Sequence, residues 1–196
     1  MVIFVWLRKM YDWVIRWADS PYSQIALFLI AFVEASFFPI PPDVLLIAMA
    51  IAFPLKAYRF ALIGVAGSVF GGCFGYWIGA NLEPFARSIV EFYNAETLVN
   101  QVGEKYEQNA FLALFIAGFT FIPYKIFTIS AGFFDLSFGK FILGSFVGRM
   151  ARFFAVAIII KIMGERAKFI IDKYFNKLAV IMVILVVLGF YLVGKS

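Results

Sequence analysis

Five ionisable side chains stand inside apolar stretches of this sequence, where they could handle protons or phosphate. Glu34 and Asp43 lie in one stretch, Lys125 lies in a second, and Arg149 and Arg152 lie in a third. In a membrane each such charge costs roughly 2.5–3.5 kcal/mol by insertion assays, and it is tolerated mainly where it faces protein or a water-filled cavity. The two arginines are three residues apart and so share a helical face, where two guanidinium groups suit a phosphate. The carboxylates could exchange protons or neutralise the cations.

The composition indicates that these stretches lie in a membrane. Hydrophobic residues make up 64% of the 196 residues and charged residues 15%, whereas soluble domains are about 45–50% apolar. The net charge of +5 comes from loop lysines and arginines, which is typical of membrane topology rather than of nucleic-acid binding. The absence of histidine excludes Ser-His proteolysis and H-E-x-x-H zinc sites, and the single cysteine, Cys73, excludes a disulfide framework. We therefore expect no enzyme, no metal and no cofactor.

The lengths of the apolar runs predict an all-α polytopic membrane protein. A spanning helix needs about 20 residues, and residues 60–80 and 141–161 meet this requirement, with a slightly short last span at 178–194. The runs at 22–55 and 110–134 are interrupted by proline, so each is predicted to form two half-length helices in a re-entrant hairpin, surrounded by protein or a cavity. The prolines that break the hairpins are Pro39, Pro41, Pro42 and Pro123.

The remaining segments are predicted to lie at or outside the membrane surface. In residues 1–20, tryptophans recur at helical spacing among charged residues, which is typical of an interfacial amphipathic helix. Residues 81–109 are polar and are predicted to form a loop, part of which is a surface helix. The hairpins, the two long spans and this loop together make one domain at 21–163.

The first long span carries a glycine at every fourth position. These glycines are Gly67, Gly71, Gly75 and Gly79. A row of small residues lets a second helix approach closely. We expect this face to pack tightly, with direct contact to a substrate as the alternative.

The two halves of the domain have the pattern of an inverted repeat. Each half is a broken hairpin followed by a span, and aligning Pro41 with Pro123 places Asp43 opposite Lys125. If both hairpins are re-entrant, most lysines and arginines fall on the side of the N-terminus; if 110–134 crosses once, the two sides carry equal numbers. The positive-inside rule therefore favours re-entrant hairpins with a cytoplasmic N-terminus. The hairpins then enter from opposite faces, as in the inverted repeats of transporters.

The segments around the proline breaks resemble the two signatures of the DedA family, also called the SNARE-associated or VTT-domain family. The first is Glu34 followed by Phe38-Pro-Ile-Pro-Pro-Asp-Val-Leu-Leu46. The second is Phe121-Ile-Pro-Tyr-Lys-Ile-Phe-Thr-Ile-Ser-Ala-Gly132, followed by Gly148-Arg-Met-Ala-Arg-Phe153. The resemblance implies opposed re-entrant hairpins, residence in the bacterial inner membrane, and movement of undecaprenyl phosphate or phospholipids. It also implies two essential membrane acids and two essential arginines, and by motif Glu34 and Asp43 match the acids.

The sequence departs from the family pattern near both breaks. Pro42 stands where the family usually has the glycine of Pro-Gly-Asp, Thr120 stands where it has an arginine, and Lys125 comes one position early. This Pro-Tyr-Lys form resembles the YqaA-like branch. That Arg149 and Arg152 take the place of the family's arginines is a hypothesis.

These features favour a transporter that moves a phosphate-bearing lipid, such as undecaprenyl phosphate or a phospholipid, across the cytoplasmic membrane. Lys125, Arg149 and Arg152 would bind the phosphate, whereas Glu34 and Asp43 would couple to protons or pair with these cations in the empty site. The expected partners are a membrane lipid and protons, with a homo-oligomer as a further option and no nucleic acid. Three alternatives remain: a proton-coupled exchanger of small ions that uses the same charges, ion pairs that only fix the two halves together, and a non-transporting membrane assembly protein, for which Glu34→Gln and Arg149→Ala should have no effect on cells.

Overall fold

The computed structural model describes residues 20, 22–37, 41–92, 96–120 and 123–163. Every regular element in these ranges is a helix, and they contain no strand. The predicted interfacial helix at 1–20 (apart from Ser20), the predicted span at 178–194 and Pro39 lie outside the described residues. The helices are α2 (Ser23–Ser36), α3 (Asp43–Ala52), the short 3-10 helix η1 (Pro54–Lys56), α4 (Ala57–Asn81), α5 (Glu83–Phe92), α6 (Glu96–Phe119), α7 (Tyr124–Phe133) and α8 (Phe138–Met163).

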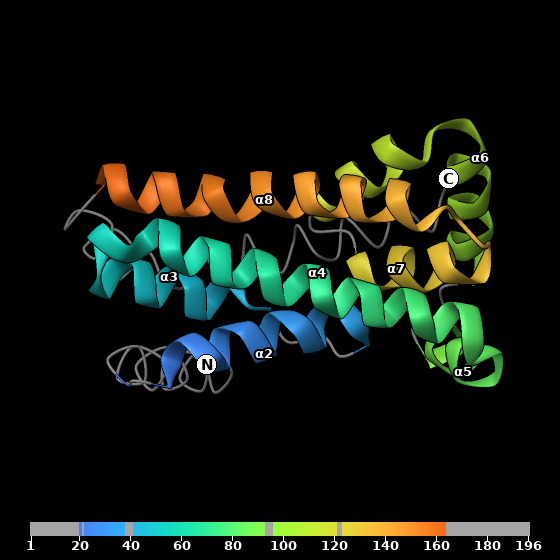
Figure 1. Ribbon diagram of the computed structural model, residues 1–196, viewed down its shortest axis with the longest axis horizontal. Helices are drawn as coiled ribbons and strands as arrows, with labels where there is room; N and C mark the ends of the chain where they lie inside the picture. The colour runs from blue at the N-terminus through green and yellow to red at the C-terminus, as the bar shows by residue number, and fades with distance from the viewer. Residues whose placement is uncertain (1–19, 21, 38–40, 93–95, 121–122, 164–196) are drawn as a thin grey trace, which may run out of the picture.

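The helices α4 and α8 form the long axis of the molecule. They have 25 and 26 residues, so each is about 37–39 Å long at the rise of an α-helix. Both are apolar and long enough to cross a membrane. They run antiparallel along the longest dimension (Figure 1). The predicted spans at 60–80 and 141–161 fall inside them.

The proline segments separate pairs of short helices. Pro42 and Pro123 stand directly before α3 and α7, at positions where a missing N–H removes no helical hydrogen bond. With 14 residues in α2 and 10 each in α3 and α7, none of these helices can cross a bilayer alone. The breaks therefore fall where the sequence placed them, while the re-entrant path of each hairpin through the membrane stays a prediction.

Residues 81–109 are mostly helical, so helices occupy more of this segment than the predicted polar loop with a surface helix in one part. The amphipathic helix α5 and the polar first part of α6 occupy this segment. Helix α6 kinks at Asn109, whose backbone is extended (φ −160°, ψ 87°). The Oδ1 atom of Asn109 accepts a hydrogen bond from the N–H of Leu112 at 3.0 Å, as an N-cap residue does. The polar residues thus continue directly into the apolar stretch Gln108–Phe119.

The glycine row of α4 lies against the backbones of α2 and α7. A Cβ atom added at Gly67 or Gly71 would collide with a carbonyl oxygen of α2, and one added at Gly79 would collide with a carbonyl oxygen of α7. Gly75 faces the hydroxyl of Thr128 in α7. Backbone contacts this close require residues without a side chain, so the row positions both hairpins on α4.

Helix α8 contacts α6 in the same manner. A Cβ atom added at Gly148 would lie 2.7 Å from the carbonyl oxygen of Phe115, and one at Gly144 would lie 2.8 Å from the Cβ atom of Leu114. Each long helix therefore holds the first helix of its own hairpin through glycines four residues apart.

Two apolar cores lie along the axis, and the charged positions fall between them. On α2, Leu27 belongs to the first core and Ala35 to the second; on α8, Phe153 belongs to the first and Phe141 to the second. The stretches that join these positions carry Glu34 on α2 and the first arginine on α8. The fold therefore places Glu34 and Arg149 at the boundary between the two cores.

Candidate functional site

Glu34, in the last turn of α2, forms a partly buried ion pair with Arg149 of α8. Nη2 of Arg149 donates a hydrogen bond to Oε2 of Glu34 at 3.1 Å, and the two side chains are 1% and 17% exposed. Tyr124 packs its ring against the guanidinium, with 3.8 Å from Cζ to the ring centroid, a cation–π contact. Nε of Arg149 is buried and has no hydrogen-bond partner. Arg149 thus keeps one donor that the protein does not use.

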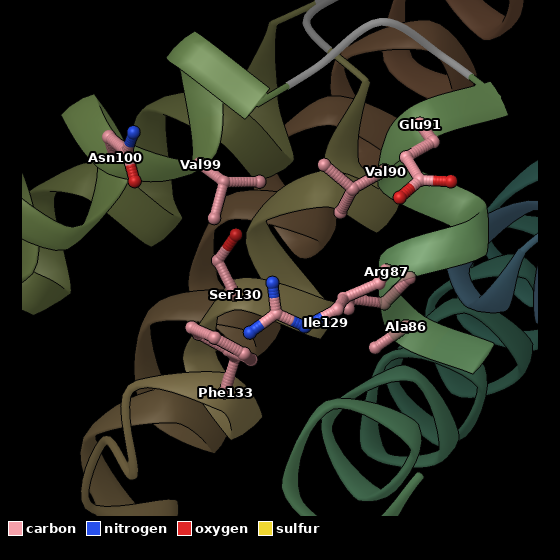
Figure 2. Close-up of a pocket in the computed structure, with 9 residues that line it drawn as sticks. All are labelled: Ala86, Arg87, Val90, Glu91, Val99, Asn100, Ile129, Ser130 and Phe133. Carbon is pink, nitrogen blue, oxygen red and sulfur yellow. The ribbon is translucent and has the colours of Figure 1, made fainter. Parts of the chain in front are cut away.

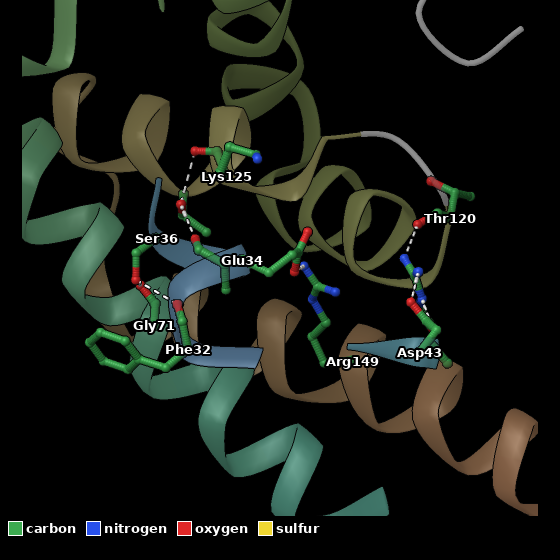
Figure 3. A network of polar contacts seen from close by, with 11 residues as sticks. Phe32, Glu34, Ser36, Asp43, Gly71, Thr120, Lys125 and Arg149 are labelled. Atoms are coloured by element: carbon green, nitrogen blue, oxygen red, sulfur yellow. Dashed lines mark hydrogen bonds and ion pairs between the residues drawn. The ribbon is translucent and has the colours of Figure 1, made fainter. Parts of the chain in front are cut away.

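Asp43, the first residue of α3, pairs with Arg152 one turn further along α8. Two donors of Arg152 meet the carboxylate: Nη2 lies 2.6 Å from Oδ2 and Nε lies 3.3 Å from Oδ1. Both side chains are 13% exposed. Nη1 of Arg152 also donates to the carbonyl oxygen of Thr120 at 2.7 Å. Because Thr120 directly follows α6, this arginine ties the break of the second hairpin to the start of α3 (Figure 3).

Lys125 lies in the first turn of α7 and is 3% exposed. It directly follows Tyr124, whose ring packs against Arg149, and so lies in the same region. Its carbonyl oxygen accepts a hydrogen bond from Oγ1 of Thr128 at 2.9 Å, and that hydroxyl also lies 3.1 Å from the carbonyl oxygen of Ala35. The first turn of α7 is thereby fixed against the end of α2 (Figure 3).

The structure therefore brings all five charged residues named from the sequence into one region. Both arginines belong to the second half of the domain and both acids to the first, so each ion pair joins the two halves. The aligned repeat placed Asp43 opposite Lys125, but the ion-pair partner of Asp43 is Arg152. The roles of the five residues in binding a phosphate or exchanging protons stay predictions.

Two contributors to the site were not identified from the sequence. Tyr124 supplies the aromatic face under Arg149, and Thr120 supplies a carbonyl oxygen to Arg152. An aromatic residue beside a lysine at a proline break was the available signal for Tyr124. A backbone acceptor leaves no signal in residue type, because every residue carries a carbonyl group.

A separate pocket of about 250 Å³ lies between α5, α6 and α7 (Figure 2). The five charged residues of the ion-pair region do not line it. The residues that line it are Ala86, Arg87, Val90, Glu91, Val99, Asn100, Ile129, Ser130 and Phe133.

Comparison with known proteins connects this architecture to a family. The model of the VTT domain matches residues 40–162, which include every charged residue of the ion-pair region except Glu34. The chain is 35% identical over 183 residues to an uncharacterized protein of Haemophilus influenzae, covering 93% of this chain and 95% of that one. An uncharacterized protein of Histophilus somni is 35% identical over 147 residues, or 75% and 77% of the two chains, and one of Methanocaldococcus jannaschii is 25% identical over 132 residues, or 67% and 79%. No solved structure matches the chain.

Proposed function

Because this chain belongs to the VTT-domain family, we propose that it is a transporter that moves a phosphate-bearing lipid across the cytoplasmic membrane. One observation carries the proposal. Two guanidinium groups of α8, that of Arg149 buried and that of Arg152 partly buried, are each neutralised by a carboxylate from the opposite half of the domain. Such a site can exchange one anion for another.

A phosphate can replace the carboxylates because it offers the same acceptor chemistry. Arg152 already uses its planar fork on Asp43, and that fork fits phosphate oxygens as well as carboxylate oxygens. At Arg149, the Nε donor without a protein partner is available to a phosphate oxygen. The headgroup would be held between the hairpins while its acyl or prenyl chains stay in the bilayer.

The exchange needs a means of releasing the carboxylates. Breaking a buried ion pair without replacement leaves an uncompensated charge and costs about 3–5 kcal/mol. Protonation of Glu34 and Asp43 would remove their negative charge and free both arginines for phosphate. Loss of these protons would restore the ion pairs and expel the headgroup. Protons are therefore the coupling ion that this arrangement suits.

The geometry also supports the hypothesis that the arginines of α8 take the place of those in the family's second signature. Arg152 reaches the carbonyl oxygen of Thr120 at 2.7 Å. Thr120 is the position at which that signature has an arginine. A guanidinium group is thus present beside this position, although it comes from another helix.

Transport in proteoliposomes tests the proposal. The purified full-length chain would be reconstituted with labelled phospholipid or with undecaprenyl phosphate, with and without a pH gradient. We expect lipid translocation that falls about tenfold or more in Arg149→Met and Arg152→Met, since each substitution removes charge-assisted hydrogen bonds to phosphate worth about 1.5–3 kcal/mol. Arg59→Gln, which removes an exposed arginine on the first turn of α4, is the matched control. No translocation by the wild-type chain under any condition would refute the proposal, and ion flux without lipid movement would identify an ion exchanger.

A structural role for the ion pairs is the second candidate, and their burial favours it. Side chains that are 1–17% exposed and already hydrogen-bonded to each other can simply fix the two halves. If so, a variant that replaces both members of one pair with neutral residues of similar size would fold and move lipid at the wild-type rate. Loss of transport in a folded double variant would support the transporter instead.

A further inference from the structure

The pocket between α5, α6 and α7 lies at the end of the molecule where α4 terminates. Helix α3 and η1 lie toward the opposite end (Figure 1). Since α4 is long enough to cross a bilayer, a pocket beside its last turn and the following helix lies at the depth of the lipid headgroups. The topology predicted from charge places this end away from the cytoplasm.

Ser130 forms part of the floor of this pocket, and its hydroxyl group makes no hydrogen bond within the described part of the protein. The residue is 1% exposed. Ser36 and Ser88 on helices, and Thr120 directly after α6, each donate to the carbonyl oxygen four residues earlier, which is a common solution for such a hydroxyl, although the hydroxyls of Ser68 and Ser145 also have no partner among the described residues. Ser130 does not use this solution. A buried hydroxyl without a partner is costly, and a ligand atom that reaches the floor would satisfy it.

Arg87 provides the positive charge of the pocket. Its guanidinium is directed into the space between the three helices (Figure 2) and lies 5.9 Å from the ring centroid of Phe133. Glu91 follows one helical turn later on α5 and lines the same pocket. The guanidinium and the carboxylate thus border one space from one face of α5.

Negative groups continue around the rim. A second hollow shares Asn100 with the pocket and carries Glu104 and Asp135, both exposed. A third hollow shares Phe133 with the pocket and is also lined by Asp135. Arg87 thus shares the pocket with the carboxylate of Glu91, and further carboxylates line the two neighbouring hollows, an arrangement that complements a ligand carrying both signs of charge.

We propose that this pocket binds a zwitterionic phosphoester headgroup, in which a phosphate is joined to an ammonium group. The phosphate would accept hydrogen bonds from Arg87 and Ser130. The ammonium group would lie toward the carboxylates of Glu91 and Asp135, and the apolar side chain of Val90 would contact the carbon atoms between and beyond the charges. This site is distinct from the ion-pair region and does not depend on lipid transport.

Binding of lipids to the full-length protein tests the proposal without any transport measurement. Native mass spectrometry of the purified chain in detergent would count adducts of phosphatidylethanolamine and of phosphatidylglycerol. We expect phosphatidylethanolamine to bind about tenfold more tightly or better, because phosphatidylglycerol has no ammonium group. Glycerophosphoethanolamine would then be added as a competitor: displacement of the lipid shows that the headgroup is recognised, and a soluble compound that binds more tightly than the lipid identifies a free phosphoester as the ligand.

Substitutions assign the binding to this pocket. Arg87→Gln should weaken phosphatidylethanolamine binding about tenfold or more, and Ser130→Ala should weaken it several-fold. The matched controls are Arg59→Gln at the opposite end of α4 and Ser88→Ala on α5, whose hydroxyl donates to its own helix; both should bind as the wild type does. Variants are compared only when their thermal unfolding matches the wild type, and Arg87→Lys provides a form that keeps the charge. Equal affinity for the two lipids, or wild-type affinity in Arg87→Gln, overturns the proposal.

Discussion

Replacing Glu34 with Gln should destabilise the protein more than replacing Arg149 with Met, although both substitutions break the same ion pair. The difference follows from what each substitution leaves behind. Glu34→Gln leaves a guanidinium that is 1% exposed, whereas Arg149→Met leaves a carboxylate that is 17% exposed and keeps part of its hydration. The buried charge that water cannot reach carries the larger penalty.

The magnitudes follow from this burial. Removing one member of a buried pair costs about 3–5 kcal/mol of unfolding free energy. Glu34→Gln should cost about 3 kcal/mol, because the amide oxygen still accepts a hydrogen bond. Arg149→Met should cost about 2 kcal/mol, since the remaining carboxylate is partly solvated. The double variant should lie within about 1 kcal/mol of the wild type, because neutral side chains of similar size replace both charges. The coupling energy between the sites is then about 4 kcal/mol or more.

Unfolding by sodium dodecyl sulfate in mixed micelles, followed by circular dichroism, measures these differences for the four members of the cycle. The reasoning is refuted if the two single variants have additive effects, since the residues would then not interact. If Arg149→Met lowers stability more than Glu34→Gln does, the argument that the less exposed charge carries the larger penalty is wrong. Glu91→Gln, at an exposed acid of α5, is the control and should change stability by less than about 0.5 kcal/mol.

Three further substitutions test other contacts of the fold. Gly71→Ala should prevent accumulation of folded protein or lower its stability by about 3 kcal/mol, because the new Cβ atom would collide with a carbonyl oxygen of α2. Gly139→Ala is the control: a Cβ atom there has nothing within 4 Å, so thermal unfolding should be unchanged or slightly later. Tyr106→Phe should cost about 1–2 kcal/mol, because the phenol donates to a carbonyl oxygen of α7 at 2.6 Å, whereas Tyr22→Phe at a side chain 64% exposed should cost nothing measurable. Arg152→Lys keeps the charge but loses the fork, so it should lower stability by about 1–2 kcal/mol and slow lipid movement; a wild-type unfolding midpoint would contradict the bidentate geometry.

The long helices and the proline breaks of the hairpins could be predicted, because each has a local cause in the sequence. The lengths of the apolar runs gave α4 and α8, and Pro42 and Pro123 marked the starts of α3 and α7. The segment at 81–109 was harder to interpret, because polar residues suit both a loop and an exposed helix. The capping of the second part of α6 by Asn109 depends on a backbone conformation that composition does not specify.

The sequence predicted which charged residues form the cluster, but not which of them pair with each other. Five ionisable residues in apolar segments must find partners, which identified the set. The choice of partner depends on how α8 rotates and slides against the first hairpin, and that is decided by contacts such as those of Gly148 with α6. The repeat register suggested Lys125 as the counterpart of Asp43, whereas the arginine fork of Arg152 occupies that place.

The two ion pairs also constrain how the protein is made. Their members are 115 and 109 residues apart in the sequence, so the ribosome synthesises both acids long before the arginines that neutralise them. The acids of the first hairpin therefore have no arginine partner until α8 has been synthesised. Pairing of Glu34 and Asp43 with these arginines is then a late event in biosynthesis, and a truncated chain that lacks α8 carries both acids without their arginine partners.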